Sequence, residues 1–137
     1  MPRAVFDTVV FVRALINPFG VWGRLIFQHG HAYTLIISPP VAEEILEVLH
    51  RPELTRRFRS LAGLDVARVI EILDDAEAVE LHNVPAVSRD PKDDKFLATA
   101  VAAGAEYLVT EDNDLLVLDS YRGLRIVTAG RFLALVE

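Results

Sequence analysis

Strand-like and helix-like segments alternate along this chain, and that alternation limits the folds open to it. Short apolar runs indicate strands, and runs with apolar residues three and four positions apart indicate helices. The predicted strands cover residues 3–7, 33–38, 78–81, 107–110 and 124–128. Such a pattern is typical of a parallel sheet with right-handed crossovers. We therefore predict the α/β class, a three-layer α/β/α sandwich with a central parallel sheet.

Capping residues and helix breakers mark the intervening helices. Ser38 is expected to cap a helix that begins at Pro39 and Pro40, and Pro52 is expected to end it. A shorter helix should end near Gly63, and Asp65 should cap the next one. The other predicted helices cover residues 8–17, 21–28, 93–103, 115–118 and 131–136. The polar stretch at residues 82–91 is predicted to be a loop.

Length and composition limit the organisation of the protein. The 137 residues, 52% of them hydrophobic, suffice for one packed domain over residues 1–137. No apolar run is long enough for a membrane span. Asp7 and Arg13 interrupt the apolar N-terminal stretch, which fits a strand and helix better than a signal peptide. Without cysteines, disulfides and thiolate metal sites are excluded, and a cytoplasmic location is expected.

The net charge of −6 bears on the class of partner. A protein that binds nucleic acid by electrostatics alone is normally basic. The charge therefore argues against a simple binding module. It argues less against a metal-dependent nuclease, whose acidic site is neutralised by its own cations.

Three short acidic segments stand where strands end or helices begin. They are VFD ending at Asp7, RDPKDD at residues 89–94, and TEDND at residues 110–114. In a parallel sheet, the carboxyl ends of the strands share one edge with the adjoining helix starts. Carboxylates gathered there repel one another unless a cation lies between them. Oxygen-rich sites suit Mg²⁺, so this edge is a candidate metal site.

Each acid has a simpler interpretation when taken alone. Asp7, Asp112 or Asp114 at a helix start is first of all a capping residue. Asp90, Asp93 and Asp94 precede a helix, where acids favour the helix dipole. The recurrence of acids at predicted sheet-edge positions is what favours a metal. The helix after Ser38 adds three more acids, of which Glu44 is expected to face this edge and Glu43 and Glu47 to be solvated.

The chemistry that fits such a site is phosphodiester hydrolysis. One or two Mg²⁺ or Mn²⁺ ions can activate water and stabilise charge on phosphate oxygens. Because Mg²⁺ keeps several waters, three or four carboxylates suffice, and no side-chain nucleophile is required.

Four segments make the chain resemble the PIN-domain family, in the branch of bacterial and archaeal toxin components of toxin–antitoxin systems. They are VFDTVVFVRAL, SPPVAEEILEVLHRPEL, RDPKDDKFLATAVAAGAEYLVTEDNDLL and RIVTAGRFL. The resemblance covers nearly the whole chain. The third segment is the most specific. The resemblance implies a parallel sheet sandwiched by helices. It also implies these metal-binding acids: Asp7, Glu44, Asp93, Asp112 and, as a frequent fifth, Asp114. Asp93 is preferred over Asp94, and Asp90 belongs to the flanking motif.

The resemblance further implies an activity and partners. The activity is Mg²⁺- or Mn²⁺-dependent endoribonuclease cleavage of RNA. The partners are a second copy of the chain, giving a homodimer, and a cognate antitoxin that blocks the site. Val9 stands where the family usually has Asn or Ser, while Thr8 is retained and is a candidate to supply a hydroxyl.

Basic and aromatic residues offer further candidates. The densest basic cluster is Arg51, Arg56, Arg57 and Arg59, beside His50. It would contact RNA phosphates or form a solvated helix face, and Arg13 and Arg24 are weaker candidates for phosphate contact. The histidines, including His29 and His31, show no zinc-site spacing. Trp22 and Phe19 are expected to pack in the core, with a dimer surface as the alternative.

Two hypotheses from different classes follow. The first is a metal-dependent ribonuclease that acts as a toxin. The second is a catalytically weak PIN-like protein that binds RNA or a partner, which Val9 favours. A phosphatase-like or small-ligand domain is least favoured, because the sequence has no glycine-rich phosphate loop.

Overall fold

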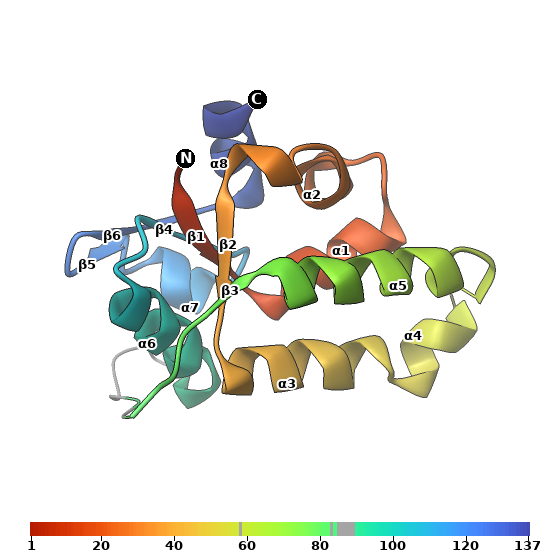
Figure 1. Ribbon diagram of the computed structural model, residues 1–137, viewed down its shortest axis with the longest axis horizontal. Coiled ribbons are helices and arrows are strands. Elements are labelled where there is room, and N and C mark those ends of the chain that lie inside the picture. Colours follow the sequence, from red (N-terminus) through yellow and green to blue (C-terminus); the bar gives the residue numbers. More distant parts are fainter. Residues whose placement is uncertain (58, 83, 85–89) are drawn as a thin grey trace.

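A six-stranded sheet forms the centre of the protein, as Figure 1 shows. The computed structural model describes residues 1–57, 59–82, 84 and 90–137. Within residues 55–65 it describes the backbone only. The spatial order of the strands is β3 (Glu77–Ala78), β2 (Thr34–Ile37), β1 (Arg3–Phe6), β4 (Tyr107–Val109), β6 (Leu124–Val127) and β5 (Ser120–Tyr121). All neighbours are parallel except β5 and β6. The predicted α/β fold with a parallel centre is therefore confirmed.

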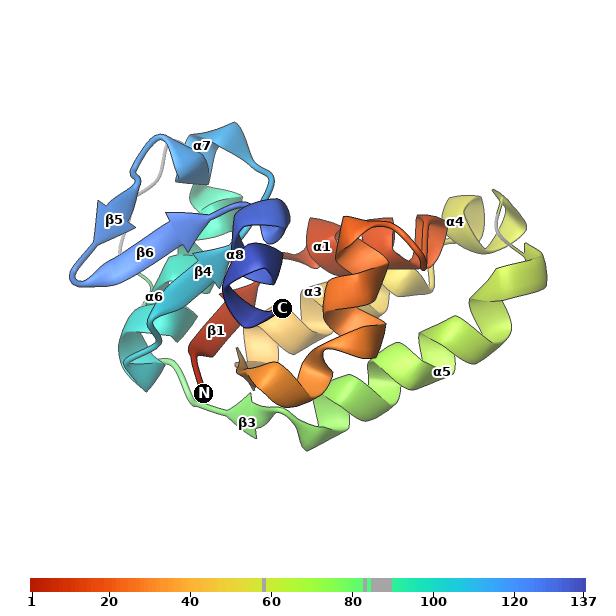
Figure 2. The same cartoon turned by 90° about the horizontal axis from the view of Figure 1, so that it is seen from above.

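Helices cover both faces of the sheet (Figure 2). The C-terminal helix α8 (Ala129–Val136) lies on one face, where Phe132 packs edge-on against Phe6 and Tyr107. On the other face lies α6 (Asp94–Ala103), whose Phe96, Leu97 and Ala100 are buried. Ala4, Val5 and Phe6 of β1 and Leu108 and Val109 of β4 are fully buried. The two central strands are consequently fixed from both faces, and so are the residues that follow them.

Three longer helices lie side by side and extend beyond the sheet in Figures 1 and 2. They are α1 (Thr8–Ile16), α3 (Pro39–Leu49) and α5 (Arg59–Asp75), with α4 (Pro52–Arg57) between the last two. Val41 and Ile45 of α3 are buried, and so is Val69 of α5. This packing places the first turns of α1 and α3 next to the carboxyl ends of β1 and β2.

The predicted break near Gly63 is wrong. The helix α5 continues through Gly63 and Asp65, and the change of helix falls between Arg57 and Arg59 instead. A glycine inside a helix costs only about 1 kcal/mol relative to alanine. A helix anchored by buried residues such as Val69 and Leu73 tolerates that cost. Asp65 is therefore an interior residue of the helix and does not cap it.

The short segments also differ from the prediction. The predicted helix at residues 21–28 is divided into α2 (Val21–Gly23) and a π-helical turn over Arg24–Gln28. The strand β5 was not predicted; it joins β6 through Arg122 and Gly123, both with positive φ. A short helix, α7 (Asn113–Leu116), precedes it. Of the predicted strand at residues 78–81, only Ala78 lies in a strand, β3, which also contains Glu77.

The prediction that Phe19 packs in the core is wrong, because its side chain is 84% exposed. Trp22 is half-buried, and its indole N–H donates to Glu111 Oε1 at 3.2 Å. Among the described residues, no single helix has the length and apolar character needed to cross a membrane, and α1 passes such a test only jointly with residues 21–28, across a bend of 111°.

Candidate metal centre

Asp7 directly follows β1 and is almost fully buried, with 5% of its surface exposed. It caps α1, because its side chain accepts a hydrogen bond from the Val9 amide at 3.4 Å. Its other oxygen, Oδ2, accepts from the hydroxyl of Thr110 at 2.7 Å. Burial raises the pKa of Asp7, the two hydrogen bonds oppose this, and the charges of Glu44 and Asp112 add to the increase. Asp7 therefore caps a helix and also belongs to an acidic site.

Thr110 connects the first and last acidic segments. It is fully buried at the end of β4, and the hydroxyl that donates to Asp7 also accepts from the Asp112 amide at 3.0 Å. Asp112 in turn caps α7 by accepting from the Asp114 amide at 2.9 Å. Asp112 is thus the capping residue at this turn, and the alternative that Asp114 caps it is wrong. The threonine fixes the separation of two acids that lie far apart in sequence.

Asp93 is the most perturbed acid of the site. It ends a 3-10 turn over Pro91–Asp93 and precedes α6, with 6% of its surface exposed. Burial raises the pKa of Asp93 to about 7, helped by a hydrogen bond to Asp112 and by the charges of Asp112, Asp7 and Asp90. Its Oδ2 atom is buried and has no hydrogen-bond partner among the residues that the structure describes. A buried carboxylate oxygen without a partner is unfavourable unless a ligand completes it.

Glu44 reaches the same region from the second turn of α3. Its Oε2 atom accepts a hydrogen bond from the hydroxyl of Thr8, and its Oε1 atom forms an ion pair with Lys95. Ser38 begins α3 without capping it through its side chain, contrary to the prediction. Its hydroxyl instead hydrogen-bonds to Thr99 at 2.7 Å, which joins the start of α3 to α6.

Asp90 also lies at this site. Carboxylate oxygens of Asp90, Asp93 and Asp114 all lie within 4.8 Å of one another. The sequence assigned Asp90 only to a flanking motif. Its side chain accepts from the Lys92 amide at 3.0 Å, which turns the chain so that Asp90 and Asp93 approach. Asp94 is also buried, at 3% exposure, and begins α6.

These oxygens fit a hard divalent cation. The group contains carboxylates only, which Mg²⁺ and Mn²⁺ prefer over nitrogen or sulfur donors. Burial, together with the charges of neighbouring acids, raises the pKa of Asp7 and that of Asp93, so a cation bound between them would favour their ionised forms. The unpartnered Oδ2 of Asp93 supplies a ligand atom. This group of carboxylates therefore fits a divalent cation, which would reduce the repulsion among the acids.

The predicted RNA-contacting residues have different surroundings. Arg51, in the connection between α3 and α4, pairs with exposed Glu47 at 2.8 Å, which fits the solvated interpretation. Arg13 lies 5.1 Å above the Trp22 ring, and Arg24 pairs with Glu137. The side chains of three further predicted residues lie outside the described part of the structure: Arg56, Arg57 and Arg59.

Val9 and Thr8 share the first turn of α1. Val9 is 38% exposed, and its contribution to the site is the backbone amide that binds Asp7. Thr8 is buried and orients Glu44, so the hydroxyl expected from the sequence does act at this site. The retained threonine therefore supplies one of the polar contacts next to the acids.

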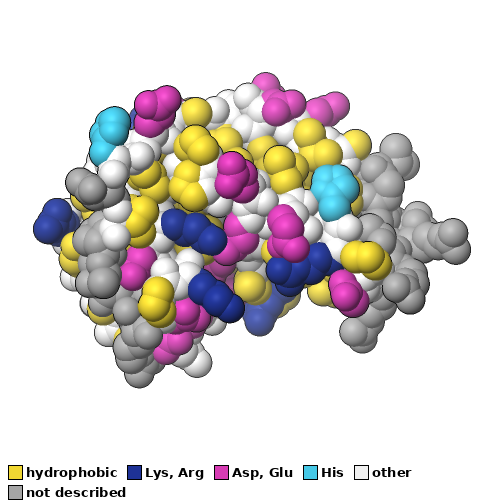
Figure 3. All heavy atoms as spheres, turned by 90° about the horizontal axis from the view of Figure 1, so that it is seen from below, with side chains coloured by type: hydrophobic (Ala, Val, Ile, Leu, Met, Phe, Trp, Pro, Cys, Tyr) yellow, Lys and Arg dark blue, Asp and Glu magenta, His cyan; other side chains and the backbone are white. Residues whose placement is uncertain are grey.

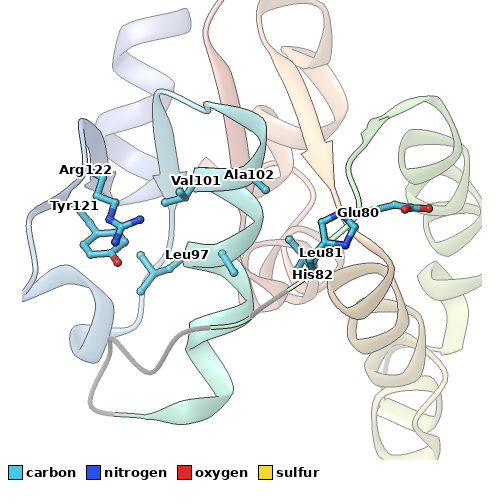
Figure 4. Close-up of a pocket in the computed structure, with 9 residues that line it drawn as sticks. Glu80, Leu81, His82, Leu97, Val101, Ala102, Tyr121 and Arg122 are labelled. Atoms are coloured by element: carbon cyan, nitrogen blue, oxygen red, sulfur yellow. The ribbon is translucent and has the colours of Figure 1, made fainter.

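A separate apolar hollow of about 360 Å³ lies against α6 (Figure 4). Leu97, Val101 and Ala102 line it from the helix, Tyr121 from β5, and Leu81 from the segment after β3. None of the candidate metal ligands lines this hollow. The candidate metal centre therefore lies at the acidic edge, apart from this pocket.

Two further residues of the site, Thr110 and Lys95, are not among the residues predicted from the sequence. Thr110 opens the TEDND segment, where the pattern predicts only the end of a strand. Lys95 follows the acids of RDPKDD, where the pattern predicts only a helix. The signal was a polar group directly beside each acidic segment.

Comparison with known proteins bears on the family and the fold. A sequence model described as PIN domain matches residues 3–114, a span that includes every candidate ligand. The uncharacterized protein MJ1680 of Methanocaldococcus jannaschii is 35% identical over 133 residues, which cover 90% of this chain and 80% of that protein.

Two solved structures share the fold. PAE2754 from Pyrobaculum aerophilum has a TM-score of 0.63 at 15% identity, over 98% of this chain and 89% of that one. VapBC2 from Rickettsia felis, solved bound to a DNA fragment from its promoter, has a TM-score of 0.59 at 13% identity, over 90% and 96%. At these identities the two structures bear on the fold alone.

Proposed function

The chain belongs to the PIN-domain family, and on this premise we propose that it is a metal-dependent endoribonuclease. PIN domains are in general metal-dependent nucleases, which makes a hydrolase the expected activity. The observation that carries the proposal is the buried, unpartnered Oδ2 of Asp93 among converging carboxylates. A carboxylate that only caps a helix does not require a buried oxygen without a hydrogen-bond partner, whereas a metal ligand does require a free oxygen.

We assign the metal to Asp7, Glu44, Asp93 and Asp112, with Asp114 in support. A bound Mg²⁺ or Mn²⁺ supplies an activated water and neutralises charge on the phosphate oxygens. The protein's part is to hold the ligands. Thr110 fixes the Asp7 carboxylate and the Asp112 backbone, and Thr8 orients Glu44.

RNA is the proposed substrate. The candidates for contact with it remain those predicted from the sequence: the hydroxyl of Thr8 and the guanidinium groups of Arg51, Arg56, Arg57 and Arg59. For Arg51, contact with a phosphate requires that it leave Glu47, which costs little because exposed ion pairs contribute little to stability.

We further propose that the chain is the toxin of a toxin–antitoxin pair, that it forms a homodimer, and that an antitoxin covers the acidic site. The shared fold with the toxin–antitoxin complex VapBC2 supports this proposal. A small open reading frame immediately upstream of the gene, with a DNA-binding pattern, is the expected observation. Co-expression of its product should suppress RNA cleavage.

The cleavage test compares two Asp→Asn changes. Asp7→Asn keeps the shape of the buried side chain but removes its charge, so Mg²⁺-dependent cleavage of a labelled single-stranded RNA should fall by at least about a hundredfold. Asp119→Asn is the matched control, because Asp119 is exposed and Asn tolerates its positive φ. Unchanged cleavage by purified Asp7→Asn protein would contradict the assignment.

The second candidate is a catalytically weak protein that binds RNA or a partner. Val9 favours it, since this exposed apolar side chain offers no polar group beside Asp7. The same assay separates the two candidates. RNA that is bound by the wild-type protein in Mg²⁺ or Mn²⁺ and stays intact would support the binding role.

A further inference from the structure

Lys95 places an ammonium group inside the acidic site. It lies in the first turn of α6 and forms an ion pair with Glu44 Oε1 across the gap to α3. The two side chains are only 23% and 26% exposed. The other oxygen of Glu44 accepts from Thr8 of α1. Glu44 is therefore held by donors from two different helices, whereas Asp93 retains an oxygen without a partner.

This ion pair places a cation on a proposed metal ligand. A divalent ion that binds Glu44 competes with the ammonium for the same carboxylate, and the ion of higher charge is attracted more strongly. Lysine suits such an exchange, because its ammonium sits on a flexible stem and carries three rotatable donors. The partial exposure of Lys95 leaves it a path toward solvent.

We propose that Lys95 is a substrate-positioning residue that leaves Glu44 for an RNA phosphate when a divalent cation binds the acidic site. The inference rests on the proposed nuclease function. A chain with net charge −6 needs local positive charge to hold a polyanion. On the face drawn in Figure 3, lysine and arginine side chains lie beside the acidic ones near its middle. A phosphate arriving at the metal ligands would bind the ammonium that the cation has displaced from Glu44.

The competing interpretation is a structural tie between α3 and α6. A tie alone predicts that loss of Lys95 lowers stability and leaves the metal affinity unchanged. An exchangeable ammonium instead predicts that loss of Lys95 raises the metal affinity, because the ammonium no longer competes with the metal for Glu44. Metal affinity and the salt dependence of RNA use are therefore the measurements that separate the two.

The experiment uses Lys95→Met, which keeps an unbranched stem and removes the charge, and Lys95→Arg, which keeps the charge. Lys92→Met is the matched control, since Lys92 is exposed and lies three residues earlier beside the same acids. Calorimetry should show Mn²⁺ binding about 3–10 times tighter to Lys95→Met than to the wild type. The slope of log KM for single-stranded RNA against log salt should decrease by about 0.7, the value for one phosphate contact. Lys95→Arg should keep the wild-type slope.

Several outcomes would overturn the role of Lys95. They are unchanged or weaker Mn²⁺ binding by Lys95→Met, an unchanged salt slope, or equal effects from Lys92→Met. Failure of the nuclease proposal would look different, because the wild-type protein itself would then neither bind Mn²⁺ nor cleave RNA. Thermal melting of each variant confirms that folded proteins are being compared.

Discussion

Asp93 shows how one residue links stability to function. Its carboxyl is buried beside Asp112, its Oδ2 atom has no partner, and its pKa is raised to about 7. The folded protein therefore holds this proton more tightly than the unfolded chain does, whose carboxyl has the ordinary value of 3.8. The stability that the protonated carboxyl contributes is complete below that value. It is lost as the pH rises toward about 7.

A pH prediction follows for the metal-free protein. In a metal chelator, the free energy of unfolding from urea titrations should be lower at about pH 8 than at about pH 5. The raised pKa of Asp7 acts in the same direction. Asp93→Asn should be more stable than the wild type at the higher pH and should show a smaller change between the two.

Asp119→Asn again serves as the control and should keep the wild-type pH dependence, since Asp119 lies outside the acidic site. An equal fall in stability for Asp93→Asn and the wild type would remove Asp93 as the cause. Addition of Mg²⁺ at the higher pH should restore part of the lost stability, because a bound cation favours the ionised carboxylate.

At the residue scale, the sequence predicts the acids better than their partners. Asp7 and Asp112 follow apolar strands, so their place at the sheet edge can be read from the chain. Asp90 and Lys95 cannot be read in this way, because a turn and an inter-helix contact bring them to the site. Thr110 resembles an ordinary strand residue until β1 and β4 pair and place its hydroxyl on Asp7.

At the scale of elements, Gly23 allows α2 to approach the preceding loop. A Cβ atom there would lie 2.0 Å from the Pro18 carbonyl oxygen, a distance that requires the backbone to move. Gly23 is buried, and the π-helical turn that follows it leads toward β2. The glycine therefore fixes how the second helical segment packs on α1.

Replacement of this glycine should destabilise the protein. In a free helix, alanine is more favourable than glycine by about 1 kcal/mol, but the clash at Gly23→Ala should lower the free energy of unfolding by about 3 kcal/mol. Gly30→Ala is the matched control, because a Cβ at Gly30 meets nothing within 4 Å. Chemical denaturation of both variants checks this, and equal stabilities would show that α2 shifts freely.

The alternation of strands and helices was predictable because apolar periodicity reports which face each element buries. The limits of the prediction also have local causes. The strand β5 has only two residues and depends on pairing with β6. Gly63 looks like a helix end, but the packing of the rest of α5 overrides it. Phe19 was expected in the core because of its residue type, yet the loop after α1 leaves it exposed.

At the scale of the whole molecule, the fold concentrates negative charge at one edge of the sheet. The chain carries a net charge of −6, and acids that are scattered in sequence converge where β1 and β4 end. The hydrophobic core makes this possible, because α6 and α8 hold the central strands from both faces. The repulsion among these acids is the cost, and binding of a divalent cation would offset it.

Calorimetric titration of the metal-free protein with Mn²⁺ tests most directly whether the acidic edge binds a metal. The wild-type protein should bind Mn²⁺ with release of protons, because the pKa of Asp93 lies near neutrality. Asp93→Asn should bind at least about ten times more weakly, since it loses a ligand oxygen. A wild-type protein that takes up no Mn²⁺, or a variant that binds it equally well, would contradict the assignment of this edge as a metal site.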